Sequence, residues 1–226
     1  MVTIKKTSAK FKTKFLDQIL KDIITVPASM NKEIFEIALD SRKVVSNSCF
    51  FSLKGRKENG LHFIKDAISK GAVAIVADDK KAREQCTQLG VPLFVIPELK
   101  KHLGTIARRF YDDPSRELKI IGITGTNGKT TIAYLLKNAL QHLKKKCLYI
   151  GTLGAGFLEY KNFLQLNNTT PDVFTLNNLF FTHSQSGATY CALEVSSIGL
   201  DQDRLQEVSL DIGVFSNITQ DHLDYH

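Results

Sequence analysis

The sequence predicts an α/β protein made of two successive units. Apolar, strand-like runs alternate with helix-like segments in the second half of the chain, which is typical of a parallel sheet with helical crossovers. A glycine-rich turn joins an apolar strand at 118–124 to a helix that runs from about 129 to 143. The polar segment 112–115 contains a proline and separates the halves, so we expect domains at 1–113 and 114–226.

The remaining elements follow from apolar spacing, taken in chain order. Apolar residues between Phe15 and Ile23 recur at helical spacing, which predicts a helix at the start of the first unit. Short apolar runs and the helical segments between them predict the rest of that unit, with strands at 34–39, 49–53, 72–77 and 93–96 and helices at 63–69 and 100–111. The second unit continues with a strand at 147–150, a helix at 173–181, and strands at 189–195 and 212–215.

Composition excludes several classes of protein. The chain has 226 residues and is 43% hydrophobic, which is enough for one large core or two small ones. It contains no run of 18 apolar residues, and its lysine-rich start lacks the apolar region of a signal peptide, so we expect no membrane insertion. Four scattered cysteines without a CxxC pair favour reduced thiols in a cytoplasmic protein over a disulfide or zinc framework.

The positive charge of the chain is concentrated in its first half. Residues 1–113 hold 21 lysines and arginines against 13 acidic residues, a surplus of eight within a net charge of +7. Such a surplus suits an anionic ligand such as a nucleotide diphosphate, or nucleic acid, although scattered lysines are more often a solvated surface. Because the sequence has no RNA-binding aromatic signature and no zinc-finger spacing, we expect no nucleic-acid partner.

The strongest local signal is a phosphate-binding loop between the strand at 118–124 and the following helix. The glycines of such a loop let backbone N–H groups approach phosphate oxygens, and the helix N-terminus adds partial positive charge. Its lysine supplies a charge for the β- and γ-phosphates of ATP, and the next hydroxyl can ligate Mg²⁺. The standard motif has its first glycine where this chain has Ile123, and an ordinary glycine turn is the alternative. The predicted ATP-binding residues are Gly125, Thr126, Asn127, Gly128, Lys129, Thr130 and Thr131.

Two further side chains follow strands at the same predicted edge of the sheet. Glu194 ends the apolar strand segment 190–193, at the edge where parallel sheets bind their ligands, and a carboxylate near a nucleotide would hold Mg²⁺. His222 lies in the polar segment after the last strand and is a candidate second metal ligand. Taken alone, a glutamate such as Glu194 is more often a solvated strand end, and a histidine such as His222 is more often a surface residue. Together with the loop, they predict a metal site formed by Thr130, Glu194 and His222, with Lys129, Glu194 and His222 in catalytic roles.

These segments together resemble the Mur ligase family. The loop at 125–131, the segment Glu194-Val195-Ser196-Ser197 and the segment 217–226 match three motifs of that family in order. Within the family, Asp40-Ser41-Arg42, Phe50–Gly55 and Asn168-Thr169-Thr170-Pro171 resemble the ligase that adds the third amino acid of the peptide. The resemblance implies a small uridine-binding N-terminal α/β domain followed by a phosphate-loop, parallel-sheet ATPase domain.

The resemblance also implies substrates and residue roles. Ser41 would lie beside the uracil, with Arg56, Lys57 and Glu58 near it. The muramoyl-dipeptide would be held by Thr169, Thr170, Ser196, Gln202 and Arg204. Ile198 departs from the family, because many relatives have histidine after the two serines.

The implied reaction is ATP-dependent amide formation through an acyl-phosphate. A cytoplasmic monomer would add meso-diaminopimelate or L-lysine to UDP-N-acetylmuramoyl-L-alanyl-D-glutamate, using Mg²⁺. The family places a carbamylated lysine shortly after His226 and then an amino-acid-binding domain, so we expect this chain to be an inactive fragment. The alternatives are a non-catalytic nucleotide-binding module and a related Mur or folylpolyglutamate ligase.

Overall fold

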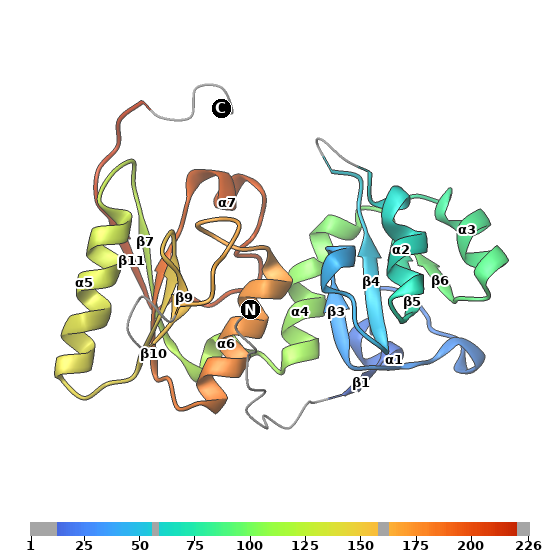
Figure 1. Cartoon of the computed structure of the whole chain (residues 1–226), viewed down its shortest axis with the longest axis horizontal. Helices are drawn as coiled ribbons and strands as arrows, with labels where there is room; N and C mark the ends of the chain where they lie inside the picture. The colour runs from blue at the N-terminus through green and yellow to red at the C-terminus, as the bar shows by residue number, and fades with distance from the viewer. Residues whose placement is uncertain (1–12, 56–58, 158–162, 221–226) are drawn as a thin grey trace. The chain divides into compact units, whose positions relative to one another are not determined.

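The computed structural model describes residues 13–55, 59–157 and 163–220 (Figure 1). The chain separates into two compact units, Met1–Phe110 and Tyr111–His226. Both units contain parallel sheets together with helices, so the α/β fold class predicted from the sequence is confirmed. In the part of the chain that the structure describes, each helix is too short or too polar to cross a lipid bilayer.

The first unit is organised around a four-stranded parallel sheet. Its strands lie in the order β3 (Glu36–Ala38), β4 (Ser48–Ser52), β5 (Ala72–Ala77) and β6 (Leu93–Val95). The neighbouring side chains Phe50 and Phe51 of β4 point to opposite faces and are each 1% exposed, so both faces of the sheet are covered. The helices of this unit are α1 (Leu16–Ile19), α2 (Ile64–Ser69), α3 (Ala82–Leu89) and α4 (Leu103–Tyr111).

Three predicted elements of the first unit differ in the structure. The helix expected between Phe15 and Ile23 is limited to the four residues of α1, because Asp22 has a positive φ of 59° that leaves the helical conformation. The strand expected at 34–39 divides into β2 (Glu33–Ile34), which pairs with β1 (Lys14–Phe15), and β3, which joins the main sheet. The helix expected from Lys100 begins with a 3₁₀ turn, Leu99–His102, before α4.

The second unit contains a five-stranded sheet in the order β11-β7-β10-β8-β9. Strands β7 (Lys119–Thr124), β8 (Cys147–Gly151), β10 (Tyr190–Glu194) and β11 (Ile212–Phe215) are parallel, as expected. The edge strand β9 (Gly154–Gly156), which we did not predict, runs antiparallel to β8. Because β7 lies between β10 and β11, the residues after these three strands meet at one edge of the sheet.

Helices cover both faces of this sheet. Helix α5 (Lys129–His142) packs on one face with Ala133, and α6 (Val173–Gln185) packs on the other with Leu176 and Phe180 (Figure 1). Asp172 caps α6 by accepting hydrogen bonds from the N–H groups of Phe174 and Thr175. Helix α7 (Ser197–Asp201) follows β10. The sheet and its two helices hold the ends of β7, β8 and β10 in fixed positions.

The segment between the units forms a short, ordered turn. Asp112 and Asp113 both have positive φ, 58° and 56°, so the backbone cannot continue α4. A 3₁₀ turn, Pro114–Glu117, then leads into β7.

The four cysteines are buried and free of disulfides, and burial raises the pKa of the Cys86 and Cys147 thiols to about 11. No thiolate chemistry is expected from these cysteines near neutral pH.

Candidate functional site

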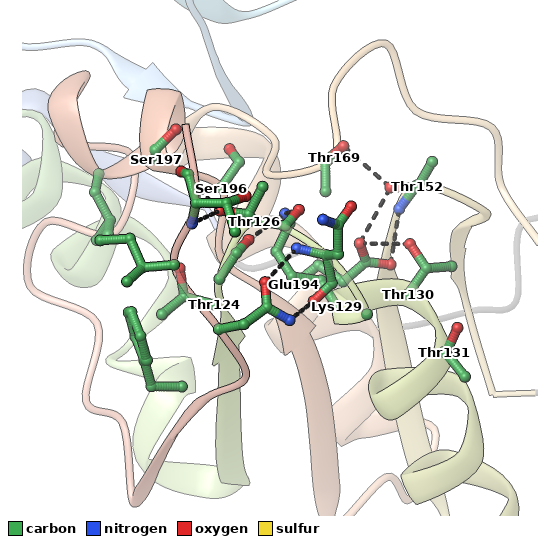
Figure 2. Close-up of a pocket in the computed structure, with 18 residues that line it drawn as sticks. Thr124, Thr126, Lys129, Thr130, Thr131, Thr152, Thr169, Glu194, Ser196 and Ser197 are labelled. Carbon is green, nitrogen blue, oxygen red and sulfur yellow. Dashed lines mark hydrogen bonds between the residues drawn. The ribbon is translucent and has the colours of Figure 1, made fainter. Parts of the chain in front are cut away.

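A pocket of about 610 Å³ lies at the carboxyl edge of the second-unit sheet (Figure 2). It is formed where β7, β8, β10 and β11 end, together with the start of α5. All seven predicted phosphate-loop residues line it, as do Glu194, Thr169 and Ser196. The other lining residues are Thr124, Thr152, Ser197, Leu200, Phe215, Asn217, Ile218 and Thr219.

The glycines of the loop are required by its shape. Gly125 has a φ of 133°, and a Cβ at this position would lie 2.2 Å from Ser216 Oγ. Gly128 has a φ of 85° and is the residue before the first turn of α5. Other residues rarely adopt these conformations, so glycine lets the backbone turn directly into the helix N-terminus. The first N–H groups of α5 have no acceptor within the helix and face the side on which an anion would bind.

The ammonium group of Lys129 donates hydrogen bonds to two carbonyl groups of its own loop. Its Nζ lies 2.5 Å from the Gly125 carbonyl oxygen and 3.0 Å from that of Thr126. The ammonium group is therefore held over the loop, next to the helix N-terminus. A phosphate entering the pocket would exchange these neutral acceptors for charged ones, which make stronger hydrogen bonds.

A second segment, about 90 residues further along the chain, holds the loop from the side. The Asn217 side chain accepts a hydrogen bond from Asn127 N–H (3.0 Å) and donates one to the Asn127 carbonyl (3.1 Å). The Asn217 carbonyl accepts a hydrogen bond from Thr126 N–H (3.0 Å), and Ser216 Oγ donates to the Asn127 carbonyl (2.7 Å). The loop is thus fixed by residues that follow β11.

Glu194 is the buried carboxylate of the site. Its side chain is 0% exposed and accepts four hydrogen bonds. Oε1 accepts from the Tyr149 hydroxyl and from Thr152 N–H (3.1 Å), while Oε2 accepts from the hydroxyls of Thr130 (2.9 Å) and Thr152 (3.1 Å). These donors replace the hydrogen bonds to water that the side chain loses on burial. Figure 2 shows Thr152 between Glu194 and Thr169.

Gly151 makes room for this carboxylate. A Cβ on Gly151 would lie 2.1 Å from Glu194 Oε1 and 2.5 Å from its Cδ. Tyr149, two residues earlier on β8, is fully buried. Burial, and then the hydrogen bond to Glu194, raise the pKa of Tyr149 well above its ordinary value, so the phenol stays protonated and remains a donor.

The oxygens at the pocket fit a magnesium–nucleotide complex. Thr130 Oγ1 and Glu194 Oε2 lie 2.9 Å apart, and both residues border the pocket. Mg²⁺ prefers such hard oxygen ligands and usually takes only one or two from protein carboxylates, with phosphate oxygens and waters completing its shell. Within residues 13–55, 59–157 and 163–220, no group of three or more His, Cys, Asp or Glu side chains forms a metal site.

The residues predicted to hold the muramoyl-dipeptide gather beside Glu194. Thr170 is 0% exposed, and its hydroxyl donates to the Glu194 backbone carbonyl (2.9 Å) and lies 3.1 Å from Ser196 Oγ. Arg204 donates to the Thr170 carbonyl (2.5 Å) and to the Gln202 side-chain oxygen (2.6 Å). Thr169 and Ser196 line the pocket, whereas Thr170, Gln202 and Arg204 form the layer that supports it.

Ser41, the predicted uracil contact, belongs to the first unit. It is 4% exposed, and its carbonyl accepts a hydrogen bond from Lys70 (3.3 Å). Hydrogen bonds from Lys70 and from the Ser41 hydroxyl hold the pKa of Asp66 below its ordinary value. Asp40 caps this turn and forms an ion pair with Arg42 (2.7 Å).

Two groups of predictions lie outside the described residues. These are His222, and the loop residues Arg56, Lys57 and Glu58. Conversely, sequence reasoning missed Tyr149, Gly151 and Thr152 as site residues. Asn217 belongs to the segment 217–226 that resembles a family motif, but no role was predicted for its side chain. Thr152 follows a parallel strand at the carboxyl edge, so the rule that selected Glu194 would also have found it. No sequence signal distinguishes Tyr149 from an ordinary core residue.

Comparison with known families covers most of the chain. A model described as "Mur ligase middle domain" matches residues 123–226, and one described as "Mur ligase family, catalytic domain" matches residues 33–111. The UDP-N-acetylmuramoyl-L-alanyl-D-glutamate--2,6-diaminopimelate ligase of Pseudomonas aeruginosa is 42% identical over 193 residues, which cover 85% of this chain and 39% of that protein. The ligase of the same name from Coxiella burnetii is 40% identical over 213 residues, or 94% and 43% of the two chains.

Solved structures agree with this similarity. A structure of a UDP-N-acetylmuramoyl-L-alanyl-D-glutamate--2,6-diaminopimelate ligase matches with a TM-score of 0.76 and 31% identity over 95% of this chain and 42% of the other. The MurF ligase from Thermotoga maritima in complex with ADP matches with a TM-score of 0.55 and 22% identity over 84% and 39%, which supports the fold alone. The chain spans about 40% of the length of the curated relatives that it matches.

Proposed function

Because this chain belongs to the Mur ligase family, we propose that it is the UDP-muramoyl-binding and nucleotide-binding part of an ATP-dependent amide-forming ligase. The reaction adds the third amino acid, meso-diaminopimelate or L-lysine, to UDP-N-acetylmuramoyl-L-alanyl-D-glutamate in peptidoglycan synthesis. The observation that carries the proposal is the pocket in which Lys129, Thr130 and the buried Glu194 surround one cavity. The enzyme works as a cytoplasmic monomer without nucleic-acid partners.

The chemistry must bring two anions together, the substrate carboxylate and the triphosphate of ATP. Lys129 and the N-terminus of α5 offset their repulsion at the β- and γ-phosphates. Thr130, Glu194 and His222 are the proposed ligands of Mg²⁺, which would supply further positive charge at the transferred phosphoryl group. The D-glutamyl carboxylate then attacks the γ-phosphorus, which releases ADP and leaves an acyl-phosphate. The amine of the incoming amino acid attacks this carbonyl and displaces phosphate.

The residues beside Glu194 are proposed to hold the acceptor. Thr169 and Ser196 present hydroxyls to the pocket, and Arg204 and Gln202 keep the Thr170 turn in place beneath them. Thr152 contacts both Thr169 and Glu194, so the acceptor site and the metal site share a residue. Such a connection would position the carboxylate for attack on the nucleotide.

A chimera tests the ligase assignment. Residues 34–226 replace the matching segment of the Pseudomonas aeruginosa relative, and the protein is incubated with MgATP, UDP-N-acetylmuramoyl-dipeptide and diaminopimelate. We expect the tripeptide product by mass spectrometry, together with ATP hydrolysis that depends on the muramoyl substrate. A folded chimera that binds ATP but hydrolyses it independently of that substrate would favour the alternative, a non-catalytic or differently directed nucleotide-binding module.

The first domain is proposed to bind the uridine end of the substrate, with residues 1–113 as its extent and 114–226 as the nucleotide-binding part. We expect UDP-N-acetylmuramoyl-dipeptide to shift NMR amide signals of an isolated 1–113 segment near Ser41 and in the segment Lys54–Gly60. The surplus of eight positive charges in this segment favours a diphosphate ligand.

Ser41→Ala should weaken that binding about tenfold, as expected for the loss of one buried hydrogen bond. Ser69→Ala, at the exposed end of α2, is the matched control and should leave the affinity unchanged. A well-folded segment whose shifts scatter over its surface would argue against a uridine site around Ser41.

A further inference from the structure

Tyr149 touches Glu194 from a neighbouring strand without taking part in the pocket. Tyr149 on β8 is paired in register with Ala192 on β10, so Gly151 and Glu194, each two residues further, are also neighbours on the same face. The Tyr149 hydroxyl donates to Glu194 Oε1 through the space that a side chain at Gly151 would fill. Tyr149 is not among the pocket-lining residues.

The ring that carries this hydroxyl is held on two sides. It stacks on Phe163 with ring centroids 5.2 Å apart and planes 12° apart, and it meets the edge of the Tyr134 ring at 6.4 Å and 83°. Tyr149 is 0% exposed, so its side chain has no room to leave this position. The hydroxyl also accepts a hydrogen bond from Leu153 N–H (3.3 Å), which leaves its own proton for Glu194.

The two carboxylate oxygens of Glu194 therefore have different surroundings. Oε1 faces the interior, where Tyr149 and Thr152 N–H donate to it. Oε2 faces the hydroxyls of Thr130 and Thr152, both of which line the pocket. Rotation of the carboxylate would break the two interior hydrogen bonds, which are costly to lose in a buried site.

We propose that Tyr149 is a positioning residue that fixes the Glu194 carboxylate so that Oε2 is presented to the metal ion of the bound nucleotide. This inference rests on the proposed magnesium–nucleotide site. It adds to that site a residue that contacts neither the metal ion nor the nucleotide. An outer partner of this kind lowers the entropy that the carboxylate loses on binding a metal. Removal of such partners typically lowers metal affinity 10- to 100-fold.

The test is Tyr149→Phe, which removes the hydroxyl and keeps the ring stack. Calorimetry on the 226-residue chain measures the affinity for ATP with Mg²⁺ and, separately, with EDTA. We expect the variant to bind MgATP about tenfold more weakly while metal-free ATP binds as in the unchanged chain. A merely structural defect would weaken both, because both depend on the same phosphate loop.

Two further variants isolate the cause. Tyr134→Phe removes a hydroxyl from the same aromatic cluster. It should leave the ratio of the MgATP affinity to the metal-free ATP affinity unchanged. Glu194→Gln should lower that ratio by itself, and adding Tyr149→Phe to it should cause little further change, because the two residues act through one interaction.

The outcomes separate this inference from the proposed function. If the unchanged chain binds MgATP no more tightly than metal-free ATP, the metal-dependent nucleotide site is itself wrong. If the unchanged chain shows a metal dependence that Tyr149→Phe keeps or increases, the site stands and the positioning role of Tyr149 is overturned. An additive effect of the two substitutions also overturns it.

Discussion

Lys129→Ala will lower the affinity of the chain for MgATP by at least about 100-fold, or about 3 kcal/mol, without unfolding the protein. The lysine contributes the only ammonium group among the residues that line the pocket in the described part of the chain. Its present partners are two loop carbonyls, both close to water, so their loss should change stability little. The phosphates of ATP would lose a charged donor that no neighbouring residue can replace.

Isothermal titration calorimetry measures this change directly. Lys145→Ala is the matched control, because Lys145 lies in the exposed turn after α5 and its removal changes the net charge by the same amount. The control should bind MgATP as the unchanged chain does. If the Lys129→Ala variant binds MgATP as tightly as the unchanged chain does, the assignment of residues 125–131 as an ATP-binding loop is wrong.

Gly151→Ala will displace Glu194 and so affect both stability and metal-dependent binding. The new Cβ would lie 2.1 Å from Oε1, and Glu194 has no free space because its side chain is 0% exposed. Overpacking of this kind lowers the free energy of unfolding by about 1–3 kcal/mol. The displaced carboxylate would also lose its hydrogen bonds to Thr152, so we expect MgATP affinity to fall at least tenfold.

Urea unfolding followed by circular dichroism gives the stability change, with Gly213→Ala as the control. Gly213 lies on β11 of the same sheet. Among the residues that the structure describes, none beyond its two chain neighbours would come within 4 Å of a Cβ there. Combining Gly151→Ala with Glu194→Asp shortens the acidic side chain by one methylene and should recover part of the lost stability. A Gly151→Ala variant that unfolds at the same urea concentration as Gly213→Ala would contradict the predicted collision.

The sequence was sufficient for the parts of the fold that depend on local patterns. Strand β5 was predicted at 72–77 and lies there, because an uninterrupted apolar run is typical of a buried parallel strand. Helix α3 was missed because only Ala82 and Cys86 of its eight residues are buried, too few to produce an apolar period. Strand β9 was missed because Gly154-Ala155-Gly156 has no strand pattern of its own and is held by pairing with β8.

The residues of the candidate site likewise fall into those that local sequence predicts and those that it does not. The glycines and Lys129 of the loop could be predicted because turn, charge and helix start are adjacent in sequence. Glu194 could be predicted from the end of a strand. The contacts of Tyr149 and the space at Gly151 depend on the register between β8 and β10, which a single sequence does not reveal. Their chemistry arises from packing rather than from a motif.

The hydrogen bonds of Asn217 to Thr126 and Asn127 make the phosphate loop a composite of two distant peptides. Residues 125–131 provide the glycines and the lysine, while the segment after β11 satisfies the polar groups on the outer side of the turn. The seven-residue motif is therefore not sufficient by itself to form this loop at another position. Grafted onto another strand–helix junction, it would leave two backbone N–H groups and a carbonyl without the partners that Asn217 provides here, and the loop would lose the shape on which its charge depends.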